Sequence, residues 1–214
     1  MKRTEKLRLI AIEGILKSQN TALARALARV SRGELVLEAD SSTPFVDFTS
    51  RDPQDLNFKK HLLRLIDRFK AQKQMNQTDM FGDSYVCDYL FFADRIYANC
   101  RLRADEKTLY DVMMAHMEKE VAIPDLVIYL QTTPDQILES LTAQYGKKQS
   151  FDEDYIKTLN NEFNEFFLYY RWSSVLIINA SQLDPEKSSH VNELYQKMQR
   201  PFAGVIFYNP PIER

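Results

Sequence analysis

Acidic side chains follow three short apolar segments of this 214-residue chain, each at the point where the segment ends. Glu13 closes the first segment, Glu38 follows the second, with Asp40 two residues further on, and Asp88 follows the third. Short apolar runs of this kind are typical of strands buried on both faces of a parallel sheet. Because open parallel sheets bind ligands beyond the carboxyl ends of their strands, we expect these carboxylates to form part of a binding site.

The segment between the first strand and the next helix has the length and position of a phosphate-binding loop. Loops of the pattern GxxxxGK[ST] close backbone N–H groups around phosphates, place a lysine on the phosphate oxygens and hold Mg²⁺ with a hydroxyl. Here Gly14 and Thr21 remain, but Gln19 replaces the second glycine and Asn20 replaces the lysine. Lys17 is the one cation inside the loop, and we expect it to be an exposed loop lysine. The pattern therefore predicts a remnant of a phosphate loop, with Thr21 as a Mg²⁺ ligand only if ATP binds.

Length, composition and charge are those of an ordinary globular protein. Apolar residues make up 44% and charged residues 27%, which excludes wholesale disorder. The 28 basic residues nearly balance 30 acidic ones, so we expect no nucleic-acid partner. No apolar run approaches about 18 residues, so we expect no contact with a membrane. The few cysteines and isolated histidines offer neither a disulfide framework nor a metal-ligand pair, and with no signal peptide we expect a cytoplasmic protein.

Strand and helix patterns alternate along the chain. We expect strands at 7–12, 35–37, 85–87, 126–130 and 175–178, and the tail at 204–208 has the pattern of a further short strand. Helical spacing occurs at about 21–30, 53–75, 105–120, from 134, 152–172 and 185–200. The aromatic stripe of the 152–172 helix predicts core or subunit packing. Alternation of this kind requires crossover connections, so we expect one α/β domain over residues 1–214, with a five-stranded parallel sheet flanked by helices.

Several stretches carry a family resemblance through their order and spacing. They are residues 10–14, Glu38, residues 43–45, the helix with Phe58, His61 and Arg68, residues 86–91 and 94–98, and residues 124–130. Together they resemble the deoxynucleoside kinase family over nearly the whole chain. The resemblance implies a P-loop NTPase-like three-layer sandwich and a homodimer. It also implies a deoxynucleoside ligand, with ATP and Mg²⁺ as cofactors if the chain is an active kinase.

The resemblance also assigns roles to single residues. In the family a carboxylate after the second strand is the general base that takes the proton from the nucleoside 5′-hydroxyl, and Glu38 holds that position. The family reads the nucleobase with a Gln and an Arg seven residues apart on one helix face, which here are His61 and Arg68. Asp88 matches the base-contacting aspartate. The other basic residues of that helix, Arg64 among them, we expect to face solvent.

The lid over the transferring phosphate departs most from the family, because Lys147 and Lys148 stand where the family carries arginines. Lysine lacks the bidentate fork of arginine, and an arginine finger is worth about 10³–10⁵ in rate. We therefore expect a pseudokinase that has lost ATP phosphate binding, needs no cofactor, and acts by binding a nucleoside or a protein partner. Two alternatives stay open: an active deoxynucleoside kinase that transfers the ATP γ-phosphate to a 5′-hydroxyl, and a pure protein-interaction module.

Overall fold

The computed structural model of the chain describes residues 7–39, 54–78, 84–146 and 150–210. Its strands all run parallel in one sheet, in the order β2-β3-β1-β4-β5-β6. Their bounds are β1 Leu9–Glu13, β2 Glu34–Val36, β3 Tyr85–Cys87, β4 Leu126–Gln131, β5 Ser174–Asn179 and β6 Val205–Tyr208. The parallel α/β sheet predicted from the sequence is confirmed, but the count of five strands is wrong. The short apolar tail forms a sixth strand, because it pairs with β5 from Val205 to Tyr208.

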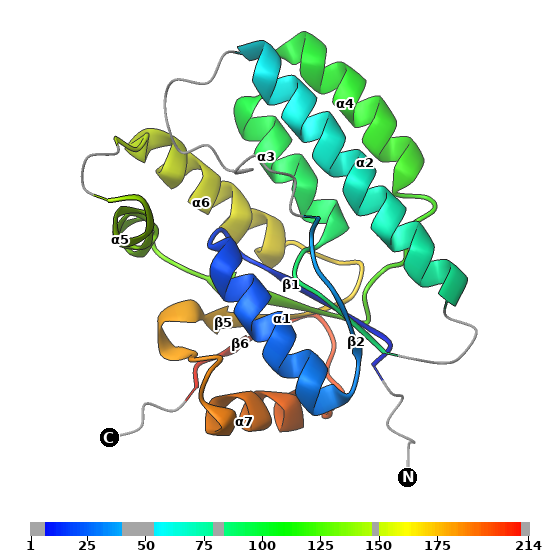
Figure 1. Cartoon of the computed structure of the whole chain (residues 1–214), viewed down its shortest axis with the longest axis vertical. Helices are drawn as coiled ribbons and strands as arrows, with labels where there is room; N and C mark the ends of the chain where they lie inside the picture. Colours follow the sequence, from blue (N-terminus) through cyan, green and yellow to red (C-terminus); the bar gives the residue numbers. More distant parts are fainter. Residues whose placement is uncertain (1–6, 40–53, 79–83, 147–149, 211–214) are drawn as a thin grey trace.

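Helices cover both faces of the sheet, so the fold has three layers (Figure 1). Their bounds are α1 Lys17–Ser31, α2 Gln54–Thr78, α3 Asp94–Arg101, α4 Ala104–Met117, α5 Pro134–Tyr145, α6 Glu153–Leu168 and α7 Ser188–Met198, with short 3₁₀ helices at Phe91–Ala93 and Ala180–Gln182. Side chains of β1 alternate between the layers: Ile10 and Ile12 pack with α1 and α7, whereas Ala11 packs with the helices of the opposite face. None of the helices in the described ranges is long and apolar enough to cross a membrane.

The aromatic stripe of α6 belongs to the core, as its spacing predicted. Phe163 and Phe167 are fully buried, and the Phe167 ring stacks on Tyr129 of β4 with 4.2 Å between ring centroids. Stacked aromatic pairs add to the free energy gained from burial alone. The stripe therefore fixes α6 against the sheet.

The position of β1 explains where a ligand site can form. β1 lies between β3 and β4, and the chain leaves it first toward β2 and β3 and later returns to β4. In open parallel sheets such a reversal of strand order opens a crevice beyond the carboxyl ends of the strands. The start of α1, one face of α2 and the segment after β3 all contribute side chains there.

Candidate functional site

Six charged side chains meet beyond the ends of β1 and β3, and we call them the charged cluster: Lys17, Glu38, Arg64, Arg68, Asp88 and Asp94. Lys17 keeps 40% of its side chain exposed, whereas the other members are at most 9% exposed. Carboxylates and guanidinium groups are rarely buried to this extent unless they are paired. The cluster is therefore held together by its own ion pairs.

Glu38, the predicted general base, lies at the centre of the cluster. Its Oε1 accepts hydrogen bonds from Nε of Arg68 at 2.5 Å and from Nε of Arg64 at 3.0 Å. Its Oε2 lies 2.9 Å from Nζ of Lys17. Burial alone would raise the pKa of Glu38, but Arg68, Arg64 and Lys17 together hold this pKa well below its usual value. Glu38 is thus an ionised carboxylate with a cation on each oxygen.

The aspartate that contacts Arg68 is Asp94, at the start of α3. Asp94 Oδ1 lies 2.9 Å from Nε of Arg64 and 3.4 Å from Nη1 of Arg68, and its Oδ2 accepts a 2.6 Å hydrogen bond from the Tyr110 hydroxyl. Sequence reasoning missed this residue. It was also wrong to expect Arg64 on the solvent side of α2, because Arg64 is buried, one turn before Arg68, with its guanidinium 4.3 Å from the centre of the Tyr97 ring.

His61 is buried on the same face of α2 as Arg68. Burial lowers the pKa of His61 to about 4, although the nearby Asp94 carboxylate acts in the opposite direction. The imidazole is therefore neutral near pH 7. Its Nδ1 is buried and has no hydrogen-bond partner in the described part of the chain.

Asp88, which the resemblance assigns to the nucleobase, faces α1. Its Oδ2 accepts a 2.6 Å hydrogen bond from the Thr21 hydroxyl, and its Oδ1 accepts one from the Glu38 backbone N–H at 2.7 Å. Lys17 Nζ lies 3.1 Å from the same Oδ1 and donates to the Asp88 carbonyl at 2.8 Å. The expectation of an exposed loop lysine is therefore wrong: Lys17 begins α1 and points at the carboxylates.

A Mg²⁺ ion would need a different arrangement of these groups. Mg²⁺ takes about six oxygens at about 2.0–2.1 Å in octahedral geometry. Here the hydroxyl of Thr21 is hydrogen-bonded to Oδ2 of Asp88, and the Lys17 ammonium lies beside the other carboxylate oxygen, Oδ1. Within the described ranges, no three His, Cys, Asp or Glu side chains gather in a way that could hold a metal. The residues present do not fit the ion.

The loop after β1 is only three residues long, residues 14–16, because α1 already begins at Lys17. Both apolar members of this loop, Ile15 and Leu16, are buried. The backbone N–H groups of Gln19 and Asn20, which replace the motif's second glycine and lysine, donate to the Leu16 carbonyl at 3.0 and 3.3 Å. Both N–H groups therefore donate their hydrogen bonds within the first turn of α1.

The side chain of Asn20 closes the loop from within. Asn20 is fully buried, and its Nδ2 donates to the Gly14 carbonyl at 2.9 Å. A Cβ atom on Gly14 would lie 2.9 Å from both Asn20 Oδ1 and the Leu130 carbonyl oxygen, which is too close. Gly14 is therefore required by its contacts with the protein.

The third predicted acid, Glu13, joins two strand ends. Its carboxylate accepts hydrogen bonds from the Gly14 N–H at 3.1 Å and the Leu90 N–H at 2.9 Å, and burial raises the pKa of this carboxyl group. The acids Glu13, Glu38 and Asp88 thus gather at one rim, as their positions predicted. Asp40 and the two lid residues, Lys147 and Lys148, lie outside the described residues.

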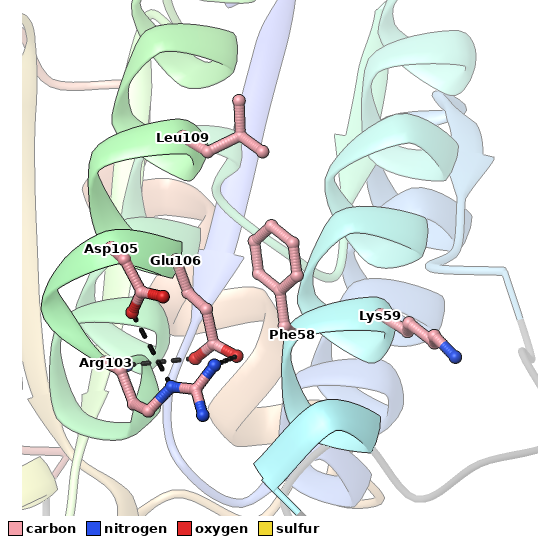
Figure 2. A pocket seen from close by; sticks show the side chains of 6 residues that line it. All are labelled: Phe58, Lys59, Arg103, Asp105, Glu106 and Leu109. Atoms are coloured by element: carbon pink, nitrogen blue, oxygen red, sulfur yellow. Dashed lines mark hydrogen bonds and ion pairs between the residues drawn. The ribbon is translucent and has the colours of Figure 1, made fainter.

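A separate hollow of about 370 Å³ lies between α2 and α4 (Figure 2). It is lined by Phe58, Lys59, Arg103, Asp105, Glu106 and Leu109. Figure 2 shows that Phe58 and Leu109 face this space, while Lys59 points away from it. The Arg103 guanidinium lies 3.2 Å from Glu106 Oε1, and the Arg103 backbone N–H donates to Glu106 Oε2 at 3.0 Å, the contact that caps the start of α4. The hollow shares no residue with the charged cluster.

Comparisons with known proteins agree with this architecture. The deoxynucleoside kinase family model matches residues 10–201. The fold is similar to that of deoxyadenosine kinase from M. mycoides with bound dATP, with a TM-score of 0.71 and 18% identity, covering 90% of this chain and 100% of that chain. The same enzyme with bound dCTP gives a TM-score of 0.69 and 18% identity, covering 89% and 98%. Curated protein sequences gave no significant match. Because the family model spans most of the sequence, the chain belongs to the deoxynucleoside kinase family.

Proposed function

We propose that this chain is a pseudokinase, a family member that binds a nucleoside but does not transfer phosphate from ATP. The observation that carries the proposal is the closed loop after β1. A phosphate loop binds its ligand through backbone N–H groups that point at the phosphates. Here the N–H groups of Gln19 and Asn20 donate to Leu16, and the apolar side chains of the loop, Ile15 and Leu16, are buried in the core.

The state of Glu38 supports the same conclusion. A general base must accept a proton from a hydroxyl within hydrogen-bond reach, and it works best with a pKa near the working pH. Both oxygens of Glu38 already contact cations, which also hold its pKa low. A substrate hydroxyl would have to displace Arg64, Arg68 or Lys17 before Glu38 could act on it.

The loss of cations also weighs against the active-kinase alternative. Asn20 stands at the position of the loop lysine, and its side chain is committed to the Gly14 carbonyl. Phosphoryl transfer depends almost wholly on positioning and on cations that stabilise the charge of the transferring group. Lys17, the one cation in the sequence of the loop, is itself paired with Glu38 and Asp88.

Buried polar groups near Arg68 favour a nucleoside over a pure interaction module. His61 presents an Nδ1 that has no hydrogen-bond partner among the described residues, on the face of α2 that carries the Arg68–Asp94 ion pair. Buried polar atoms normally have a partner, and polar groups converging in a mostly apolar environment are typical of small-molecule sites. A heterocyclic base offers donors and acceptors that match such groups.

Calorimetric titration tests this proposal directly. The purified chain is titrated with Mg·ATP and, separately, with each deoxynucleoside, together with an Arg68→Met variant and an Arg95→Met control, whose target residue lies outside the charged cluster. We expect heat with a deoxynucleoside that Arg68→Met loses and Arg95→Met keeps, and no heat with Mg·ATP. Micromolar binding of ATP would contradict the proposal and lead to a turnover assay. If neither Mg·ATP nor any deoxynucleoside gives binding heat, the protein-interaction module is favoured.

The proposal includes a homodimer in the cytoplasm, as expected from the sequence. Leu63 of α2 is 58% exposed, and Leu109 and Val112 of α4 are 51% and 64% exposed, although the two helices pack against each other. Large apolar side chains left exposed on these two helices favour a subunit contact. Light scattering during gel filtration measures the mass. We expect a dimer that Val112→Asp weakens, and a monomeric wild-type protein would contradict this part of the proposal.

A further inference from the structure

Thr21 and Asp88 are the residue types that hold Mg²⁺ in P-loop enzymes, where a loop hydroxyl and an aspartate bind the ion together. Here the Thr21 hydroxyl donates to Asp88 Oδ2 at 2.6 Å. The other carboxylate oxygen of Asp88 is directed at Lys17, whose Nζ lies 3.1 Å away. A cation therefore does sit beside this pair, and it is part of the polypeptide.

The ammonium group of Lys17 matches its surroundings completely. An ammonium has three N–H donors and no acceptor. Within the described ranges its oxygen neighbours are the Asp88 carbonyl at 2.8 Å, Glu38 Oε2 at 2.9 Å and Asp88 Oδ1 at 3.1 Å. These are ordinary N–H···O distances, whereas Mg²⁺ draws oxygens to about 2.0–2.1 Å. The oxygens are thus spaced for an ammonium.

The place of Lys17 in the helix is unfavourable without these partners. Lys17 is the first residue of α1, and this first turn contains no acidic residue. The amino end of a helix carries a partial positive charge, which repels a lysine in the first turn. The carboxylates of Glu38 and Asp88 offset this repulsion, so Lys17 and the two acids depend on one another.

We infer that the Lys17 ammonium takes the place that a divalent cation holds in active enzymes of this fold, so that the chain neutralises Glu38 and Asp88 without a metal. The inference rests on the proposed pseudokinase function, since an enzyme that transfers phosphate from Mg·ATP would need the ion. It adds a specific consequence: the site takes up no Mg²⁺ or Mn²⁺ while Lys17 is present, and removal of Lys17 opens it to the metal.

The test uses Mn²⁺ as the probe, with electron paramagnetic resonance for binding and thermal unfolding with and without MgCl₂ for stability. For the wild-type protein we expect the spectrum of free Mn²⁺ and an unchanged melting temperature. For Lys17→Met we expect melting roughly 2–8 °C lower in EDTA, partial recovery with MgCl₂, and at least tenfold tighter Mn²⁺ binding than wild type. The matched control is Lys73→Met, which breaks a 2.8 Å pair between Lys73 and Glu120 with a lysine of similar exposure, 41%. It should gain no Mn²⁺ binding.

Two results would overturn the inference: Mn²⁺ bound by the wild-type protein at this site, or a folded Lys17→Met that neither loses stability nor gains Mn²⁺ binding. If Lys17→Met does not fold, Lys17→Arg keeps the charge, and Mn²⁺ binding by that variant would count against the inference. The proposed function fails separately, through ATP binding in the calorimeter. If the wild-type protein binds Mn²⁺ but does not bind ATP, the inference about Lys17 is rejected and the proposed function is not.

Discussion

Arg68 donates through Nε to Oε1 of Glu38 across 2.5 Å, although the two residues lie 30 positions apart and both side chains are buried. The bond joins the segment after β2 to the middle of α2. The resemblance gives Glu38 the part of a proton acceptor, yet the contacts make it the anion around which buried cations gather. We therefore expect a residue to which the resemblance gives a catalytic part to contribute to the stability of the fold.

The first prediction concerns the cost of removing Arg68. Arg68→Met leaves Glu38 and Asp94 with one fewer cation in a buried site, and breaking a buried ion pair from one side costs about 3–5 kcal/mol. We expect the free energy of unfolding in urea at pH 7.5 to fall by that amount. The control Arg95→Met breaks a half-buried pair with Glu118 and should cost about 0–1 kcal/mol. Equal losses in both variants would show that the charged cluster does not stabilise the protein.

A second prediction separates stability from catalysis at Glu38. Glu38→Gln keeps the shape of the side chain but removes the charge shared by Arg64, Arg68 and Lys17, so we expect a loss of about 3–5 kcal/mol in unfolding free energy. A coupled assay with ATP and each deoxynucleoside should give background rates for the wild-type protein and for this variant. Wild-type turnover that Glu38→Gln abolishes would instead assign Glu38 as a general base.

Much of the fold follows from local patterns. The buried strands β1 and β4 are continuous apolar runs, and the period of α6 is visible in its aromatic residues. α3 could not be separated from its surroundings, because Phe91, Phe92 and Ala93 before it are all buried and show no helical alternation. The count of strands failed at β6, an edge strand of four residues whose pairing with β5 is a long-range contact.

The candidate site could be predicted only where position along the strands decides it. Glu38 and Asp88 follow strand ends, and topology brings them together. The burial of Arg64 was missed because its position in the sequence of α2 does not show whether the side chain faces solvent. Its burial follows only once Asp94 is known to lie within ion-pair distance. Lys17 was named as a site candidate, but its surroundings were wrongly predicted. Whether it is exposed or paired depends on where the segments after β2 and β3 bring Glu38 and Asp88 in space.

The third prediction tests the closed loop. Asn20→Ala removes the buried hydrogen bond to the Gly14 carbonyl, which should cost about 1–3 kcal/mol, whereas Asn192→Ala on the exposed face of α7 should change little. Asn20→Lys restores the motif's lysine, but we expect no ATP binding because the N–H groups of the loop stay engaged in α1. Calorimetry decides, and micromolar ATP binding by Asn20→Lys would show that the loop reopens easily.

The last prediction follows from the buried, neutral His61. Its pKa is about 4 in the folded protein and 6.5 in an unfolded reference, so the unfolded chain binds more protons between these values. Stability from His61 is therefore complete above pH 6.5 and is lost as the pH falls toward 4. We expect the wild-type protein to lose about 2 kcal/mol of unfolding free energy between pH 7.5 and pH 5 through this residue.

His61→Gln provides the comparison that isolates this effect. Glu38, whose pKa lies well below 4.5, stays ionised in the folded protein at pH 5, while the raised pKa of Glu13 acts in the opposite direction to His61 in both proteins. The difference between wild type and His61→Gln therefore cancels the contribution of Glu13. Urea unfolding at pH 7.5, 6.0 and 5.0 should show the wild-type protein losing stability faster than the variant. Parallel losses would mean that folded His61 takes up its proton as readily as an unfolded one, which requires water or an open ligand site at the imidazole.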